Sequence, residues 1–195
     1  VLSFGATSDA TITHDSATDG LDFKRVATAA NTPMILTLQT GSTAVVVSDV
    51  IGAIDFQAPD EAGGTDAILI AAGIEAVSEG TFGIANNATK LSFKTAASEA
   101  AAEKMSLSST GVLTVKGSVV PSVADAAALG SATLEWSDLF LADGSVINLG
   151  NDQDVKLTHI ADTGVRLNDA MALQFRDSAI SIASSADGQL DIDAD

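Results

Sequence analysis

Two histidines, His14 and His159, are the side chains best suited to acid–base or metal chemistry, because imidazole titrates near neutral pH and binds metals when neutral. Both end the same pattern, Asp-x-x-aliphatic-Thr-His, at residues 9–14 and 154–159. This repeated placement, outside any pattern typical of a pocket, favours a structural role. We therefore predict that each ring hydrogen-bonds a turn or packs near a symmetry axis. Binding of a metal or an anion at such an axis is the alternative.

Carboxylates form the second group of candidates. Asp191, Asp193 and Asp195 alternate with aliphatic residues, which places them on one face of a strand. Such a row could bind Ca²⁺ where several chains converge. It lacks the glycine and the distal glutamate of an EF-hand loop, so we favour a solvated strand face and expect no bound cofactor. The same interpretation applies to Asp152 and Asp154.

Pairs of neighbouring carboxylates are the candidates for hydrolytic chemistry. Asp60 with Glu61, or Glu75 with Glu79, could serve as the acid and base of a glycoside hydrolase. However, the chain has no Tyr and one Trp, so the aromatic platforms on which sugars stack are nearly missing. No Gly-x-Ser-x-Gly elbow occurs, and residues 63–65 lack the lysine of a phosphate-binding loop. We predict no catalytic residue and no enzyme.

Charge excludes two classes of partner. The 195 residues carry a formal net charge of −17, from 26 acidic and 9 basic residues. Binding to nucleic acid needs clustered Lys and Arg, and attraction to anionic membranes needs the same. Cysteine is absent, so neither a disulfide framework nor a thiolate metal site can form. A protein that is exposed outside the cell and has no disulfide must gain its stability from packing or from oligomerisation.

Membrane insertion is not expected. The longest apolar stretch, residues 67–76, contains Gly73 and Glu75 and is far too short to span a bilayer. The first residues lack the basic region and apolar run of a signal peptide. Since the chain begins with Val1 and stops at Asp195 within an alternating pattern, we expect it to be a fragment or a processed form of a longer protein.

Short strands are the elements expected to position these residues. Apolar and polar residues alternate with period two, and runs of this kind recur at intervals of about 8–12 residues with Gly, Asn, Asp and Ser between them. This arrangement predicts an all-β protein. The clearest runs are 34–39, 44–47, 51–56, 90–94, 105–107, 113–115, 180–182 and 190–193.

Two stretches are predicted to include one or two short helical turns. Residues 96–105 are rich in Ala and Glu, which are good helix formers, but they lie between two alternating runs, so we predict a hairpin excursion with one turn of helix. Residues 123–140 contain a run of alanines that Gly130 would end, as a C-cap glycine does. The lone Trp136 lies here, and we predict that it packs as a core anchor with Leu129 and Leu139 where two modules join.

These elements group into four segments. We expect β modules at 1–50, 51–118 and 143–195, with a connector at 119–142. The first and last contain the two histidine patterns, and each pattern is followed by a glycine, Gly20 or Gly164. The first copy has one extra residue. We predict that both copies adopt the same local structure, a strand that enters a turn completed by the glycine.

Three segments resemble proteins of phage tail fibres. The residues 87–95 and 103–115, with Phe93, the Glu-Lys-Met strand and the Ser-Ser-Thr-Gly turn, are similar to a module common in those fibres. Residues 128–140 resemble their "Leu-Gly-Ser…Trp-x-x-Leu-Tyr" element, which often lies upstream of a self-cleaving chaperone domain. The Thr-His repeat and the acidic end at 187–195 look like fibre proteins of marine phages and prophages.

This resemblance implies a fold and a function. It implies an elongated homotrimer of serial, intertwined β modules in a virion appendage, outside the cell. Other virion proteins would be its partners, and a glycan or a protein of the host surface could be its receptor. No chaperone domain follows Asp195, so self-cleavage is not assigned.

Two other functions remain open. A bacterial surface adhesin or self-assembling extracellular filament would share the same β-rich, cysteine-free composition. A polysaccharide depolymerase spike is the alternative from the enzyme class. A virion anchor or a chaperone in the flanking sequence would favour the phage fibre, whereas a secretion signal and a wall anchor would favour the adhesin.

Overall fold

A computed structural model describes residues 2–4, 10–17, 20–25, 33–58, 64–169 and 171–194. The chain divides into two compact units, residues 1–122 and 123–195. Both contain antiparallel sheets, and none of the residues that the structure describes is helical, so the predicted all-β fold is confirmed.

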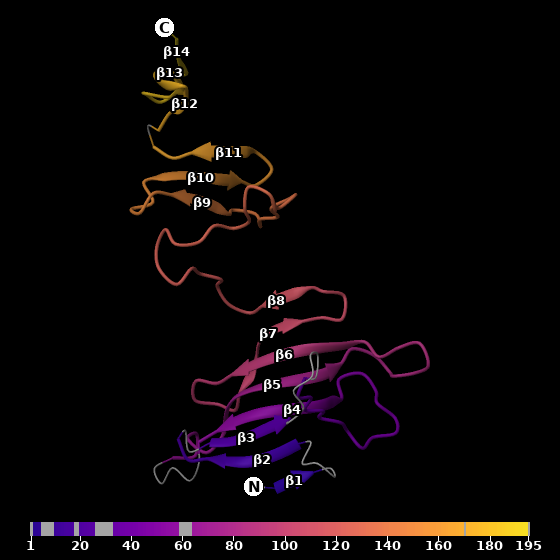
Figure 1. Cartoon of the computed structure of the whole chain (residues 1–195). Helices are drawn as coiled ribbons and strands as arrows, with labels where there is room; N and C mark the ends of the chain where they lie inside the picture. The colour runs from indigo at the N-terminus through magenta and orange to yellow at the C-terminus, as the bar shows by residue number, and fades with distance from the viewer. Residues whose placement is uncertain are drawn as a thin grey trace. The chain divides into compact units, whose positions relative to one another are not determined.

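Every sheet is a meander in which each strand pairs with its neighbour along the chain (Figure 1). The first unit contains a three-stranded sheet, β1 (Leu2–Phe4), β2 (Ala10–Asp15) and β3 (Gly20–Arg25), and a five-stranded sheet, β4 (Val50–Gln57), β5 (Ile70–Ser78), β6 (Thr89–Thr95), β7 (Ala102–Leu107) and β8 (Leu113–Val115). The second unit contains two three-stranded sheets, β9 (Val146–Leu149), β10 (Val155–Ile160) and β11 (Gly164–Leu167), then β12 (Leu173–Phe175), β13 (Asp177–Ala183) and β14 (Asp191–Asp193).

Glycine closes the hairpin between β7 and β8. Gly111 has a φ of 81°, in the left-handed region that side chains with a Cβ rarely adopt. Its N–H donates to the carbonyl of Ser108, whose own N–H donates to the carbonyl of Val112. The Ser-Ser-Thr-Gly segment is therefore a tight turn that sets the register of the two strands.

The five-stranded sheet has two chemically different faces. Strand alternation sends successive side chains to opposite faces, and the register places apolar residues directly opposite one another across all five strands. We call this the apolar face. Its central row, one residue from each strand, consists of Ile54, Ile74, Phe93, Met105 and Val115.

Charged residues lie on the other face, which we call the charged face. Within these five strands, which the structure describes in full, every charged side chain alternates to that side except Lys104, the extra residue of a β-bulge. The charged face carries Asp55, Glu75, Lys90, Lys94 and Glu103. The sheet is thus amphipathic, with complete separation of charge from the apolar row.

Three-stranded sheets repeat this design. In the β9–β11 sheet, Leu157 of the central strand pairs with Ile147 and with Leu167. In the β12–β14 sheet, Ile182 holds the equivalent position. It pairs with Leu173 and Ile192.

The two histidine patterns adopt the same structure, as predicted. His14 lies on β2 opposite Leu21, and His159 lies on β10 opposite Val165. Each strand leads into a turn, and the next strand begins at Gly20 or at Gly164. In the first copy, residue 9 and two residues between the strands, 18 and 19, lie outside the described residues.

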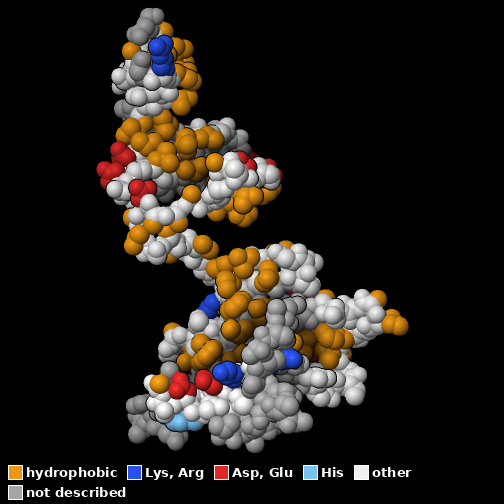
Figure 2. Space-filling view, viewed as in Figure 1, with side chains coloured by type: hydrophobic (Ala, Val, Ile, Leu, Met, Phe, Trp, Pro, Cys, Tyr) orange, Lys and Arg blue, Asp and Glu red, His pale blue; other side chains and the backbone are white. Residues whose placement is uncertain are grey.

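Apolar side chains find little cover within the chain. Among the described residues, the only buried hydrophobic ones are Val45 and Ala101, which are 8% and 9% exposed. Hydrophobic side chains reach the surface in both units (Figure 2). The accessible surface is 15196 Å², whereas two compact units of these lengths would together have roughly 10,000 Å². Among the described residues, the apolar faces of the sheets are therefore only partly covered.

The predicted helical turns are wrong in both stretches, whereas the hairpin predicted around residues 96–105 is present between β6 and β7. Ala102–Leu107 forms β7 and pairs with β6, and residues 97–100 are a bend before it. In the second stretch Gly130 has the expected positive φ, 84°, but it precedes a turn closed by a bridge between Ser131 and Leu134. A helix this short is marginal in water unless an apolar face is buried, so strand pairing and turn formation override the helical preference of alanine.

Ser78, the last residue of β5, holds the loop that precedes β4, so loss of its hydroxyl should destabilise the fold. Its hydroxyl donates to the carbonyl of Val46 and accepts the N–H of Asp49 at 3.1 Å, while the residue is only 2% exposed. We expect Ser78→Ala to lower the free energy of unfolding by about 1–3 kcal/mol, measured by urea denaturation, because both backbone groups lose a partner. Ser122→Ala, at an exposed position, is the control; equal stability of the two variants would contradict the prediction.

Candidate functional site

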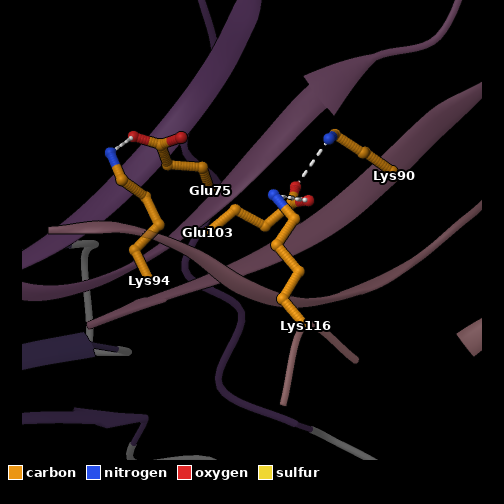
Figure 3. A network of polar contacts seen from close by, with 5 residues as sticks. All are labelled: Glu75, Lys90, Lys94, Glu103 and Lys116. Atoms are coloured by element: carbon orange, nitrogen blue, oxygen red, sulfur yellow. Dashed lines mark hydrogen bonds and ion pairs between the residues drawn. The ribbon is translucent and has the colours of Figure 1, made fainter. Parts of the chain in front are cut away.

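Ion pairs connect the strands on the charged face (Figure 3). The Glu103 carboxylate lies 2.6 Å from Nζ of Lys90 and 3.1 Å from Nζ of Lys116. A second pair joins Lys94 to Glu75 at 2.5 Å. These contacts tie β5, β6 and β7 together with the residue that follows β8.

The long side chains of these pairs also shield small polar residues beneath them. Ser92 and Ser106 lie opposite each other on the charged face and are among the least exposed residues of the sheet. Aliphatic stems of Lys and Glu can cover such positions while their charged ends stay in water. The serines of the charged face are thereby covered without a large apolar side chain.

Glu103 is held in its ionised form. The pKa of its carboxyl falls from 4.5 to about 2, chiefly because Lys90 donates a hydrogen bond to it, with Lys116 and Ser92 adding to the effect. Partial burial acts in the opposite direction and is outweighed. The carboxylate therefore acts as a fixed negative charge and not as a proton donor at neutral pH.

A groove of about 580 Å³ runs along the charged face. Glu75 and Glu79, nominated from the sequence as an acid and base pair, both line it. Glu75 pairs with Lys94, and Glu79 accepts the N–H of Ser109 at 2.8 Å. Hydrogen bonds from Ser109 lower the pKa of Glu79. The acid of a glycosidase needs a raised pKa, and the shift at Glu79 is in the opposite direction.

The other nominated pair, Asp60 and Glu61, lies outside the described residues. So does Asp195. Of the three aspartates proposed as weak metal ligands, the structure therefore describes Asp191 and Asp193.

Asp191 and Asp193 share a strand face, as their alternation predicted, but both take part in local contacts. Asp191 accepts the N–H of Ser185 at 3.0 Å and a hydrogen bond from Gln189, and these bonds lower the pKa of its carboxyl. Asp193 lies 3.3 Å from the hydroxyl of Ser181. Within the described ranges, no three His, Asp or Glu side chains gather as a metal site would require.

His159 lines an apolar hollow of about 390 Å³ on the β9–β11 sheet. Its Nδ1 accepts the N–H of Gly144 at 3.4 Å and lies 3.7 Å from the carboxylate of Asp143, so the ring contacts a turn as predicted. The rest of the lining is mainly aliphatic: Leu139, Leu141, Ile147, Leu157 and Val165, with Ser145. His14 occupies the equivalent strand position in the other unit, where it is exposed.

Trp136 is not the buried anchor that the sequence predicted. It lines one groove of about 680 Å³ with Leu129 and Leu139, the two expected neighbours, but it is 69% exposed. The physical reason is that this stretch pairs with none of the four described sheets, so strand pairing brings no described sheet against the ring. Phe140, also in the lining, is exposed as well.

Sequence reasoning missed the Glu103 ion pairs. A signal was present, since Lys90 and Lys94 alternate with Leu91 and Phe93 and must therefore lie together on the opposite face. Only the strand register, which a β-bulge shifts, shows that Glu103 is their neighbour.

Comparisons with known protein families, curated proteins and solved structures find no match to this chain. No helix among the described residues is long and apolar enough to cross a membrane.

Replacing Glu103 should remove a pH-dependent part of the stability. Because its folded pKa lies below the ordinary 4.5, its contribution is fully present above pH 4.5 and is lost as the pH falls towards about 2. We expect Glu103→Gln to be less stable than the wild type by about 1 kcal/mol at pH 7 in urea denaturation, and the difference to shrink below pH 4.5. For Glu135→Gln, at an exposed position, no such narrowing is expected; a constant difference for Glu103→Gln would refute the assignment.

Proposed function

We propose that this chain is a non-catalytic structural segment of a phage tail fibre or another virion appendage, assembled as a homotrimer. The observation that carries the proposal is the lack of cover on the apolar face of the sheets. A single chain that leaves Ile54, Leu113 or Ile192 largely in water loses the main driving force for folding.

The size of the uncovered surface supports assembly. The chain exposes roughly 5,000 Å² more than two compact units of these lengths would. Obligate oligomers bury about 2,000–5,000 Å² or more per interface, so the excess is of the size that permanent assembly removes. Exposed apolar patches on a monomer seldom exceed a few hundred Å².

The fibre assignment rests on the resemblance of the sequence and on its agreement with local structure. The segments that resemble a phage fibre module form β6, β7 and β8, joined by the turn at Gly111. Trimeric assembly follows from the same resemblance. In this proposal the neighbours are other virion proteins, the location is outside the host cell, and the fibre contributes to host attachment.

A depolymerase is the weaker proposal. Its best candidate pair, Glu75 and Glu79, is held by Lys94 and by Ser109, and the groove that they line contains no aromatic side chain. The adhesin reading shares the exposed apolar faces, and no feature of the described residues favours it over the phage fibre.

The assembly state is directly measurable. We expect light scattering after size-exclusion chromatography to give three times the chain mass of 19.6 kDa at micromolar concentration. Because only the assembled state buries the apolar faces, the Tm should also rise with protein concentration. A stable, folded monomer with a Tm independent of concentration would contradict the proposal.

Location in the virion needs a separate experiment. Antibodies raised against this chain should label an appendage of purified virions in electron microscopy, and deletion of the gene should remove both the label and the appendage. As the control, antibodies against a capsid protein should label both kinds of particle. Label on the surface of uninfected bacteria instead would favour the adhesin.

A further inference from the structure

We infer that copies of this chain bind one another through the apolar faces of their sheets, and that the charged faces remain in contact with water. This inference rests on the proposed self-assembly and adds which surface forms the interface. The occupant of the apolar face is a second copy of the same chain.

Charge distribution is the first argument. Copies of a chain with a net charge of −17 repel one another, and like charges brought together at the contact would add to that repulsion. The apolar face of the five-stranded sheet meets that condition, since charged residues alternate to the other side and Lys104 stands at the bulge. In the β9–β11 sheet, the equivalent face has one titratable side chain, His159, among aliphatic residues.

The charged face is a poor alternative interface. Its principal carboxylate, Glu103, already has Lys90 and Lys116 as partners, and Glu75 already has Lys94. Covering these ion pairs with another protein would remove them from water, and the desolvation cost could exceed any new attraction. Water is the environment that suits this face best.

Recurrence of the same pattern identifies the occupant. Each of the four sheets has a row of apolar residues across its strands, centred on Ile12, Ile74, Leu157 or Ile182. An unrelated partner would need a separate complementary face for each of these sheets. A second copy carries the same apolar rows itself, so each row can pack against its own equivalent.

Pairs of adjacent residues allow a matched test. In three sheets, an edge strand presents two neighbouring exposed side chains, one on each face. On the apolar faces, Leu113, Val165 and Ile192 are 60%, 71% and 69% exposed. Their neighbours on the opposite faces are Thr114, Arg166 and Asp193, which are also exposed.

The experiment measures the reactivity of single cysteines in the full-length chain. Since the protein has no native cysteine, each variant has one thiol to react with a maleimide dye. The variants are Leu113→Cys, Val165→Cys and Ile192→Cys, with Thr114→Cys, Arg166→Cys and Asp193→Cys as matched controls. All six positions are exposed in a single chain, so a difference within a pair reports a neighbouring copy.

We expect the three apolar-face thiols of the assembled protein to react roughly tenfold or more slowly than their neighbours, since labelling must await local opening. In urea the two members of each pair should react equally. Light scattering on each variant confirms that the labelled species is the oligomer.

Each other result has a defined meaning. An oligomer in which both members of a pair react quickly, or both slowly, overturns the assignment of the interface to the apolar face while leaving self-assembly intact. Slow reaction of the control positions alone would place the interface on the charged face. A monomeric wild-type protein would instead overturn the proposed function itself.

Discussion

Apolar side chains aligned across neighbouring strands, all on one face of a sheet, are the constraint on which this structure depends. In the five-stranded sheet, the central row from Ile54 to Val115 fixes the pairing of every strand, because a slip by one residue would turn apolar side chains towards the charged face. The turn at Gly111 and the bulge beside Lys94 adjust the backbone so that this alignment holds. Everything else, including the location of the charges, follows from that alternation.

Electrostatics then complements the apolar alignment. The charged face carries both signs, and Glu103 lies between Lys90 and Lys116, so local attraction offsets part of the repulsion expected from the strongly acidic composition. Small serines beneath these side chains allow the strands to lie under a polar cover without aromatic residues. A sheet with few aromatics can in this way protect one face by ion pairs while leaving the other for packing.

The period-two pattern identified strands such as residues 90–94 and the shared structure of the histidine copies. It was wrong at 34–39 and 44–47, which form no strand because alternation alone does not supply a neighbouring strand to pair with. The third three-stranded sheet was not recognised as a copy, because it lacks the Thr-His residues and only its strand register relates Ile182 to Leu157. The prediction of helical turns was wrong, because alanine content does not show whether a neighbouring strand is available for pairing. Trp136 was expected to be buried because it is large and apolar, yet burial depends on a second layer that local sequence does not encode.

The meander topology has a consequence for how such a chain can change its length. Every strand pairs with a neighbour in sequence, so a complete three-stranded unit can be added or removed without breaking a hydrogen bond in any other sheet. The two histidine copies, which differ by one turn residue, are the outcome expected from duplication of one such unit followed by divergence. Evolution can therefore change the number of sheets in this protein in discrete steps, while each sheet keeps its own register.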